Sequence, residues 1–441
     1  MQIYVAKSGD TISGIAGQFG VVPALLAADN GLALDARLAV GQTLVIRFPK
    51  TIHTVSAGET IYSIALQYGV STLTLYRNNF FLQGLPTVRS GDILVIEYEQ
   101  ESKLGTFGVN GYAYPYIDIA QLDATLPYLT YLTPFTYGIS ADGGLLPLND
   151  AELLAAAGHY RTVGLMHLST LTEEGSFSND RSSVLLASEE KQERLILSII
   201  QNLRRKNYFG LDVDFEFVYP EEREAYAAFI AKLRDRLNPL GYPVIVALAP
   251  KTSAEQQGLL YESHDYALLG QAANAVFLMT YEWGYTYGPP MAVAPLPQVR
   301  AVLDYAVTEI PPENIFMGIP LYGYDWTLPF QQGASKAESL STKRAVELAV
   351  QYGAEIFYDE VSQAPYFYYT PRSGREHVVW FEDARSMEAK LRLAAEYGFQ
   401  GIGFWNLMRE MPQLWPLLDS LYDVEIIEQK RLFDRRGGFR A

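Results

Sequence analysis

The chain has no cysteine, few histidines and no long hydrophobic run, and each absence removes a class of function. Without cysteine there are no disulfide bonds, no thiolate metal ligands and no cysteine nucleophile. The five histidines are scattered without the spacing of a metal site, so we expect no bound metal. No apolar stretch reaches the length of a membrane span, and residues 1–5 lack the basic and apolar regions of a signal peptide. We therefore expect neither membrane insertion nor a secretory leader.

Positive charge is also scarce, since 34 Lys and Arg face 50 Asp and Glu, which gives a net charge of −16. Residues 1–100 carry six basic and seven acidic side chains, so nearly all of the excess falls on residues 101–441. An acidic body of this kind argues against nucleic acid as a partner. Aromatic residues are plentiful, with 31 tyrosines, and their flat rings pack well on the C–H faces of sugars. The composition therefore favours a carbohydrate ligand, and we expect the protein to act as a monomer.

The first hundred residues contain a tandem repeat. Residues 8–16 align with residues 57–65 at an offset of 49, and residues 41–46 align with 91–96 at an offset of 50. Each copy is predicted to fold as strand, helix, helix, strand. Gly-Asp-Thr in one copy and Gly-Glu-Thr in the other precede the first helix, where an acidic side chain favours the positive end of the helix dipole.

Both copies closely resemble the LysM domain, a small βααβ module that binds glycans containing N-acetylglucosamine, such as peptidoglycan and chitin. The resemblance implies one module over residues 1–49 and a second over residues 50–100. It also implies a glycan groove in each copy. The groove residues would be Gly9, Asp10, Thr11 and Asn30 in the first module, and Gly58, Glu59, Thr60 and Asn79 in the second.

From residue 103 to residue 425, apolar β-rich runs alternate with helical patterns such as those at 189–206, 221–237 and 385–396. Eight runs can be identified, at residues 106–112, 131–137, 161–167, 211–217, 243–250, 275–281, 315–322 and 401–405. Eight βα units predict an α/β fold of the TIM (β/α)8 barrel type. A helix near 342–347 and β-like segments up to 369 predict a small α+β insertion at about 330–378, between strands seven and eight. Residues 426–441 form a charged, glycine-containing C-terminal tail typical of disorder.

The segment at residues 209–216 reads Phe-Gly-Leu-Asp-Val-Asp-Phe-Glu and is the most informative of the chain. Alternate side chains of a strand share one face, so Asp212, Asp214 and Glu216 are expected to point the same way. Three carboxylates on one face of a buried strand oppose folding, because each loses its water and repels the next. They could be satisfied by buried Arg or Lys partners. Such clusters, however, mark functional sites more often than scaffolding, so we interpret them as catalytic.

This segment resembles the fourth barrel strand of glycoside hydrolase family 18, which carries Asp-Gly-x-Asp-x-Asp-x-Glu. Residues 279–281 are similar to the family's Met-x-Tyr motif, residues 318–323 to its seventh strand, and Trp405 to the tryptophan of its eighth. The resemblance implies retaining, substrate-assisted hydrolysis of β-1,4 N-acetylglucosaminyl bonds without a cofactor. Glu216 would then be the acid, with its pKa raised by Asp214. Asp214 would orient the 2-acetamido group, Tyr281 would bind its oxygen, and Asp212 would tune Asp214 from deeper in the barrel.

Further polar and aromatic residues fall at the expected carboxyl ends of the strands, where TIM barrels place their active sites. The candidates for substrate binding are Tyr137, Glu282, Trp283, Tyr322, Asp325, Trp326 and Trp405. For Asp325 and Trp326 a structural pair at a strand end is an equal alternative. His167 is expected to be a histidine of the core or rim, and a position facing the cleft is the alternative.

Two positions depart from the family pattern. Phe209 stands where the family has its first aspartate, and residues 167–170 read His-Leu-Ser-Thr where the family usually has Ser-x-Gly-Gly. Both departures argue against standard chitinase activity more than against hydrolysis itself.

Family 18 motifs behind two LysM copies are similar to the cortex-lytic N-acetylglucosaminidases of spore germination in endospore-forming bacteria. That likeness implies spore-cortex peptidoglycan as substrate, and a location in the coat and cortex region of the spore or on the cell wall. The alternatives are a chitinase or chito-oligosaccharide hydrolase, and a non-catalytic glycan-binding protein. The intact Glu216 and Asp214 argue against the last of these.

Overall fold

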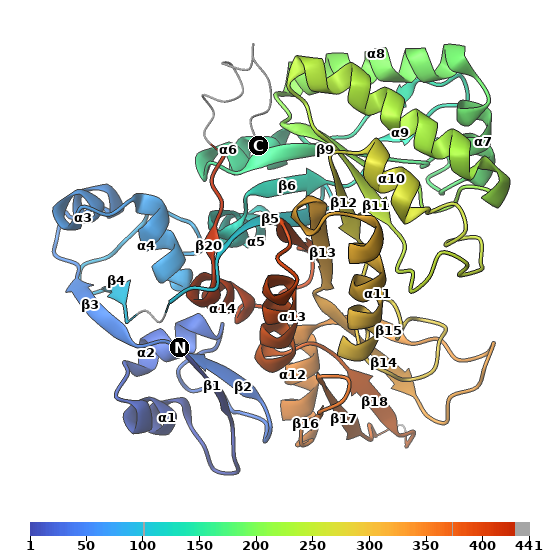
Figure 1. Ribbon diagram of the computed structural model, residues 1–441. Coiled ribbons are helices and arrows are strands. Elements are labelled where there is room, and N and C mark those ends of the chain that lie inside the picture. The colour runs from blue at the N-terminus through green and yellow to red at the C-terminus, as the bar shows by residue number, and fades with distance from the viewer. Residues whose placement is uncertain (100–101, 373, 428–441) are drawn as a thin grey trace.

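The largest part of the molecule is a closed barrel of eight parallel strands (Figure 1). The computed structural model describes residues 1–99, 102–372 and 374–427, and the expected disorder of the tail beyond residue 427 lies outside them. In barrel order the strands are β5 (Thr106–Ala113), β6 (Tyr131–Pro134), β9 (Val163–Ser169), β10 (Gly210–Asp214), β11 (Val244–Leu248), β12 (Ala275–Leu278), β13 (Ile315–Pro320) and β19 (Gly401–Trp405). Strand β19 pairs with β5 and closes the barrel, while the short β20 (Asp423–Val424) pairs with the other side of β5. The predicted TIM barrel is confirmed.

Helices surround the barrel and bury the outward side chains of the strands. They are α5 (Ile119–Thr125), α6 (Ala151–His159), α7 (Asn179–Leu186), α8 (Glu189–Lys206), α9 (Arg223–Leu237), α10 (Tyr266–Ala272), α11 (Leu296–Glu309), α13 (Ala384–Glu396) and α14 (Leu414–Leu421). Phe215, just past β10, shows the pattern, because its ring stacks on Tyr226 and Phe229 of α9 at centroid distances of 5.6 and 6.2 Å. The alternation in this segment thus sends aromatic side chains to the helices and leaves the acidic ones for the barrel interior.

A second sheet lies between β13 and β19, and it forms the insertion. Its strand order is β15-β14-β18-β17-β16, with all pairs antiparallel. The elements are β14 (Tyr322–Thr327), β15 (Glu338–Ser341), α12 (Thr342–Tyr352), β16 (Phe357–Asp359), β17 (Ala364–Tyr369) and β18 (His377–Trp380). The sheet therefore begins at Tyr322 and includes Asp325 and Trp326, which the sequence interpretation had placed just before it.

Two small modules precede the barrel. The first contains β1 (Gln2–Val5), α1 (Ile12–Phe19), α2 (Pro23–Asp29) and β2 (Thr43–Ile46); the second contains β3 (Pro49–Thr54), α3 (Ile61–Tyr68), α4 (Thr72–Asn78) and β4 (Ile93–Tyr98). In each, the two strands pair with each other and the helices enclose a small apolar core. The expected βααβ fold is confirmed. Within the described residues no single helix has the length and apolarity to cross a bilayer, and α1 with α2 passes such a test only as a bent pair.

Both modules dock on the barrel rather than hanging from it. Arg47, at the end of β2, is buried and bonds Asp29 of its own module and the carbonyl of Asn78 in the second. Its guanidinium also stacks on Tyr98 at 3.9 Å and lies 3.8 Å from the carboxylate of Asp419 on α14. One side chain thus joins the first module, the second module and the barrel.

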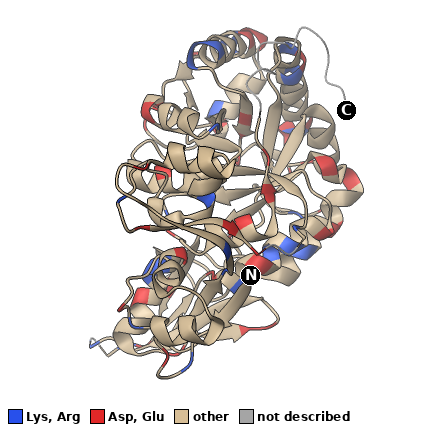
Figure 2. Ribbon diagram, turned by 90° about the vertical axis from the view of Figure 1, so that its left-hand side faces the viewer, with Lys and Arg blue, Asp and Glu red and all other residues tan. Residues whose placement is uncertain are grey.

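Acidic and basic residues are interspersed along the chain in Figure 2, with neither sign gathered on one element of that view. The excess of acidic side chains is therefore not confined to one element of this view.

Candidate active site

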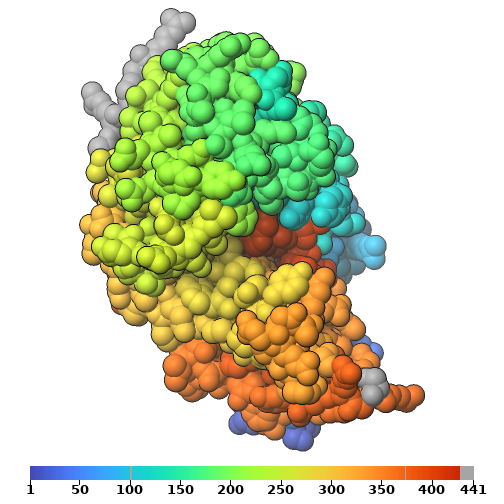
Figure 3. Space-filling model, turned by 90° about the vertical axis from the view of Figure 1, so that its right-hand side faces the viewer, coloured from blue at the N-terminus to red at the C-terminus, as the bar shows by residue number. Residues whose placement is uncertain are grey.

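A cleft of about 600 Å³ opens at the carboxyl ends of strands β10, β11 and β12. In Figure 3 the surface is hollowed between the yellow-green part of the barrel and the orange insertion, with dark red residues near the end of the chain at its floor. The cleft is lined by Asp214, Glu216, Pro250, Thr252, Gln256, Leu260, Tyr261, Met279, Tyr281, Glu282, Trp283 and Trp405. Six of the residues predicted for catalysis or substrate binding are in this set.

Asp212 lies deepest in the barrel and is fully buried. One carboxylate oxygen accepts a hydrogen bond of 2.8 Å from the Tyr112 hydroxyl, and the other has no hydrogen-bond partner among the described residues. Burial raises the pKa of Asp212 to about 6, against the opposing effects of His167 and of the Tyr112 hydrogen bond. The group therefore carries a proton for part of the time near neutral pH.

Asp214 stands between Asp212 and the cleft, two residues further along the strand. The Nε2 atom of His167 lies 3.6 Å from one of its oxygens, and its other oxygen is buried without a partner in the described chain. The His167 Nδ1 atom is 2.6 Å from the Thr136 hydroxyl, which fixes the ring. Asp214 lines the floor of the cleft, although most of the residue is buried.

Glu216 follows the end of β10 and reaches the cleft. Loss of solvent raises its pKa to about 8, and the charges of Asp214 and Glu282 add to the effect. At neutral pH the side chain is therefore mostly a neutral carboxylic acid that can donate a proton. This is the protonation state that a general acid needs.

The backbone before Glu216 is anchored by a buried histidine that the sequence interpretation did not single out. His264 accepts a hydrogen bond from the backbone N–H of Ala249 at Nδ1, so its Nε2–H donates to the carbonyl of Phe215 at 3.1 Å. Burial lowers the pKa of His264 to about 4, so the ring stays neutral and keeps this tautomer. His264 therefore ties the end of β10 to the end of β11.

Glu282 faces Glu216 from the end of β12. The Tyr324 hydroxyl donates to its carboxylate at 3.1 Å, and the Tyr322 hydroxyl donates a shorter hydrogen bond to the same oxygen. The residue as a whole is exposed, but the cleft wall desolvates its carboxyl group and raises its pKa. Both tyrosines come from β14, so the insertion holds one wall of the cleft.

Aromatic rings form the rest of the wall. Tyr281 is buried beside the carboxylates, and both its burial and the charge of Asp214 raise its pKa, so its hydroxyl keeps its proton. Trp405 at the end of β19 packs edge-on against Phe135 at 4.9 Å and against Tyr112 at 5.6 Å. Trp405 and Trp283 both line the cleft and offer flat apolar surfaces on which a sugar can stack.

Four predicted substrate contacts lie outside the cleft lining, and one of them, Tyr322, instead bonds Glu282 of the cleft wall. The Tyr137 hydroxyl donates to buried Asp150 and accepts a hydrogen bond of 2.7 Å from Lys206, so it belongs to the scaffold. Trp326 is 1% exposed and donates from its ring to the carbonyl of Gly288 at 2.9 Å. Asp325 accepts hydrogen bonds from Tyr369 at 2.6 Å and from the His377 ring at 2.8 Å. The contacts of Asp325 and Trp326 match the structural alternative, in which the two residues stabilise a strand.

The residues predicted to bind glycan in the two modules also make structural contacts within their own module. Asp10 accepts from the backbone N–H of Lys7 and Glu59 from that of Ser56, while Thr11 and Thr60 cap the helices that follow. Gly9 and Gly58 have φ angles of +88° and +87°, which shape the turn before each cap.

Asn30 and Asn79 are buried, and each amide bridges the end of the second helix to the closing strand. Asn30 bonds the backbone of Leu26 and Val45, and Asn79 bonds Leu75 and Val95. Their repetition at an offset of 49 follows from this shared structural duty.

Sequence reasoning missed several residues around the site. Tyr112 and Thr136 are buried behind the carboxylates, and the segment 250–261 forms one wall of the cleft. Tyr112 could have been found from the alternation of β5, which places it on the inward face with Asn110. Segment 250–261 gives no such signal, because its path depends on tertiary contacts. No cluster of three or more His, Asp or Glu with metal-binding geometry occurs in residues 1–99, 102–372 and 374–427.

Comparison with known families gives two matches. The family model described as glycosyl hydrolases family 18 matches residues 173–410, and the LysM domain model matches residues 4–47 and 53–96. The first match covers more than half of the chain and contains all four proposed catalytic residues.

Individual proteins match along nearly the whole length. The chain is 39% identical over 436 residues to a cortical fragment-lytic enzyme of Bacillus subtilis (strain 168), covering 96% of this chain and 99% of the relative. The crystal structure of the Bacillus cereus spore cortex-lytic enzyme SleL superposes with a TM-score of 0.81 at 35% identity, covering 96% of this chain and 99% of the other. A chitinase from Chromobacterium violaceum gives a TM-score of 0.66 at 26% identity, over 71% of this chain and 98% of the other.

Proposed function

Since the chain belongs to the glycosyl hydrolases of family 18, we propose that it hydrolyses β-1,4 N-acetylglucosaminyl bonds of peptidoglycan, above all in the spore cortex. The observation that carries the proposal is the pair of Asp214 and Glu216 at the cleft, with the pKa of Glu216 raised to about 8. The choice of cortex rests on likeness to the cortical fragment-lytic enzyme.

The acid step falls to Glu216. Cleavage of a glycosidic bond requires a proton on the leaving oxygen while positive charge develops at the anomeric carbon. Glu216 is protonated below about pH 8 and faces the open cleft, so it can donate that proton. Once ionised, it can accept a proton from the water that completes hydrolysis.

The nucleophile is best supplied by the substrate. Glu282, the other carboxylate at the cleft mouth, is held by two tyrosine hydroxyls. Family 18 enzymes use the 2-acetamido carbonyl oxygen of the sugar, which attacks the anomeric carbon and forms an oxazolinium ion with overall retention. In this proposal Asp214 accepts a hydrogen bond from the acetamido N–H, with Asp212 behind it, and Tyr281 donates to the acetamido oxygen; the positions of Asp214 and Tyr281 in the cleft lining support these roles.

The two LysM modules support binding of a glycan that contains N-acetylglucosamine, such as peptidoglycan. Such binding keeps the enzyme at the spore or cell wall and raises the local concentration of its substrate. We place the protein in the coat and cortex region of the spore.

The test is mass spectrometry of the products from spore cortex, vegetative peptidoglycan and chitin oligomers. We expect cortex fragments with N-acetylglucosamine at the new reducing end, and NMR of the first product should give the β-anomer. Cleavage of chitin alone would favour the chitinase alternative, and an α-anomer would refute the substrate-assisted step.

The matched control is Glu216→Gln, which keeps the size of the side chain and removes its proton. Turnover should fall by a factor on the order of 10² to 10⁴ or more, while binding to the wall persists. Equal turnover would refute Glu216 as the acid. Absence of turnover in both proteins would leave glycan binding alone as the function.

A further inference from the structure

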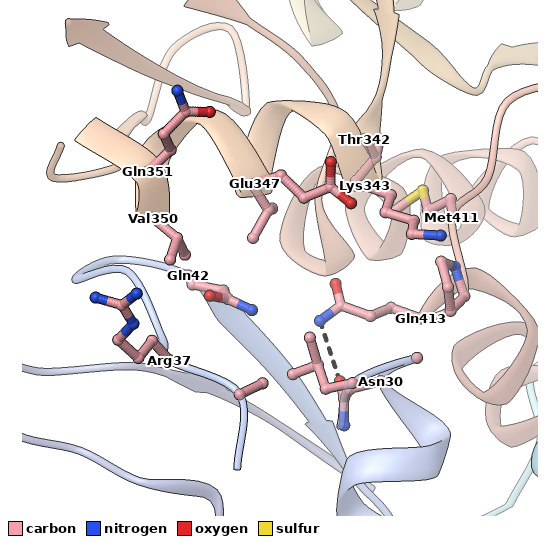
Figure 4. A pocket seen from close by; sticks show the side chains of 15 residues that line it. Asn30, Arg37, Gln42, Thr342, Lys343, Glu347, Val350, Gln351, Met411 and Gln413 are labelled. Atoms are coloured by element: carbon pink, nitrogen blue, oxygen red, sulfur yellow. Dashed lines mark hydrogen bonds between the residues drawn. The ribbon is translucent and has the colours of Figure 1, made fainter. Parts of the chain in front are cut away.

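A cavity of about 540 Å³ lies between the first LysM module and the insertion, away from the catalytic cleft. We call it the junction cavity. One wall is the loop after α2, with Asn30, Arg37 and Gln42, and the opposite wall is one face of α12 together with Pro412 and Gln413 (Figure 4). Its volume is in the range of natural ligand sites. The first LysM module and the insertion each supply part of the lining, so neither forms this cavity alone.

The α12 wall is a single helical face of mixed chemistry. Lys343, Val346, Glu347, Val350 and Gln351 recur at spacings of three and four residues, which places them on one side of the helix. Figure 4 shows the amide of Gln42 across from Glu347 and Val350, with Arg37 at the rim. Apolar methyl groups, neutral amides and charges of both signs suit a glycan whose rings carry acetamido groups and lactyl carboxylates. Several of these groups already have partners within the protein, as in the pairs of Gln413 with Asn30 and of Lys343 with Glu410, and exposed Arg37 at the rim supplies positive charge for a carboxylate.

A second cavity of about 310 Å³, the linking cavity, continues from the first toward the barrel mouth. The two cavities share four lining residues, Gly31, Lys343, Met411 and Pro412. The linking cavity is also lined by Leu407, which is two residues after Trp405 at the catalytic cleft. Two residues of chain span at most about 7 Å, so the same short segment of chain supplies one lining residue to the cleft and one to the linking cavity.

An aromatic pair, Tyr114 and Tyr116, lies on the loop that runs from the end of β5 to Asp118 of the linking cavity. Tyr116 is 75% exposed and stacks on Tyr114 with a centroid distance of 5.3 Å. Tyr114 in turn packs near Trp405 at 6.2 Å, and Asp118, two residues after Tyr116, lines the linking cavity. An exposed ring in this place is a platform for a sugar.

We propose that the junction cavity, the linking cavity and Tyr116 together bind a strand of peptidoglycan glycan whose other end lies in the catalytic cleft. This inference rests on the proposed function and extends it. The first LysM module and the insertion then hold the same polymer that Glu216 cuts, so long strands are bound at two places and short ones at the cleft alone. Binding at two linked places raises affinity by orders of magnitude when one polymer spans both.

The first test fills the junction cavity with Glu347→Trp. Glu347 is exposed, so the indole enters the cavity without disturbing a core. The matched control is Val361→Trp, an exposed position of the insertion outside the cavity lining. KM for long soluble glycan strands should rise on the order of tenfold in Glu347→Trp and stay unchanged in the control. KM for a tetrasaccharide, and kcat for both substrates, should stay at the wild-type values.

The second test concerns Tyr116. Tyr116→Ala should raise KM for the long strands only, while Tyr116→Phe, which keeps the ring, should behave as wild type. Isothermal titration of long strands into Glu216→Gln proteins, with and without Glu347→Trp, measures binding without turnover.

The outcomes separate the two proposals. If wild type cleaves both substrates and the cavity variants match it on both, the extended path is wrong and the proposed function stands. If wild type cleaves neither substrate, the proposed function fails. In that case, a lower affinity for long strands in the titration with Glu347→Trp would still support the cavity as a glycan site. An equal affinity would overturn it.

Discussion

At the scale of single residues, the setting of Glu216 determines how activity depends on pH. Its pKa is raised to about 8 by burial and by the charges of Asp214 and Glu282. A general acid works only while protonated, so kcat/KM should fall as pH rises through about 8. Replacing Glu282 by Gln removes one of the charges that raise this pKa. The alkaline limb of the pH profile should therefore move to lower pH in Glu282→Gln, and an unmoved limb would contradict the assignment.

The same raised pKa predicts a gain in stability on mutation. Between about pH 4.5 and 8 the unfolded chain has lost the Glu216 proton that the folded chain still holds, so the free energy of unfolding falls as pH rises. Glu216→Gln has no such proton and lacks this fall. The variant should be more stable than wild type, by a margin that grows from about pH 4.5 to 8. Thermal denaturation across this range measures the margin, and a constant difference would argue against a raised pKa.

How far single residues could be predicted depended on whether a periodic pattern governs them. Strand alternation was enough to place Asp212, Asp214 and Glu216 on one side and Phe215 on the other. It said nothing of His167 beside Asp214, because that contact joins two neighbouring strands whose register follows from the closed barrel. His167 is buried as expected, yet it contacts the carboxylate at the cleft.

At the scale of elements, strand ends decide which side chains reach the cleft. The apolar run at 131–137 suggested a strand that ends at Tyr137, but β6 ends at Pro134. Tyr137 then forms a separate bridge to Leu168, with its hydroxyl turned to Asp150. An apolar run cannot reveal where a strand ends inside it, so Tyr137 was assigned to substrate.

The place of Tyr137 leads to a test by Tyr137→Phe. The change removes hydrogen bonds to Asp150 and Lys206 while keeping the ring, so stability should drop by about 1 kcal/mol. KM for a tetrasaccharide should be unchanged, because the hydroxyl does not line the cleft. Unfolding by urea and steady-state kinetics give the two values. A raised KM with unchanged stability would restore Tyr137 to the substrate site.

The number and order of the barrel strands were predicted because each is a short apolar run separated by amphipathic helices. The start of the insertion was placed too late for a related reason. β14 follows β13 after a single residue and is nearly as buried, and only the antiparallel pairing with β15 and β18 separates it from the barrel. Pairing partners distant in sequence are not visible in a single run of residues.

At the scale of the whole molecule, the docking of the first module depends on glycine. A Cβ atom on Gly41 would come within 1.9 Å of the carbonyl oxygen of Ile356 in the insertion, whereas on Gly91, its counterpart in the second module, it would meet open space. The φ angles are similar, at +84° and +94°. Both Gly→Ala changes should therefore cost about 1–2 kcal/mol of backbone strain, and Gly41→Ala should cost clearly more. Calorimetry of the two variants makes the comparison. Equal losses of stability would show that the contact with Ile356 does not hold the first module against the insertion.

The sequence repeat predicted two equal modules, and the structure makes them unequal. Both keep the βααβ fold, but the loop before β2 packs on the insertion, while Gly91 in the second module stays free of the barrel. A repeat reports the core that both copies share. It cannot report which copy a third domain covers, since that depends on surfaces that the repeat does not constrain.

The buried Arg47 ties both modules to the barrel. We therefore expect little relative motion between the LysM modules and the catalytic cleft. When two binding places on a protein cannot move relative to each other, a polymer that occupies both must bend to fit them. A glycan strand held taut in an intact network resists such bending, whereas a strand with a free end is slack. We therefore expect faster cleavage of peptidoglycan with free strand ends than of an intact, tensioned network, through the mechanics of the substrate as well as its chemistry.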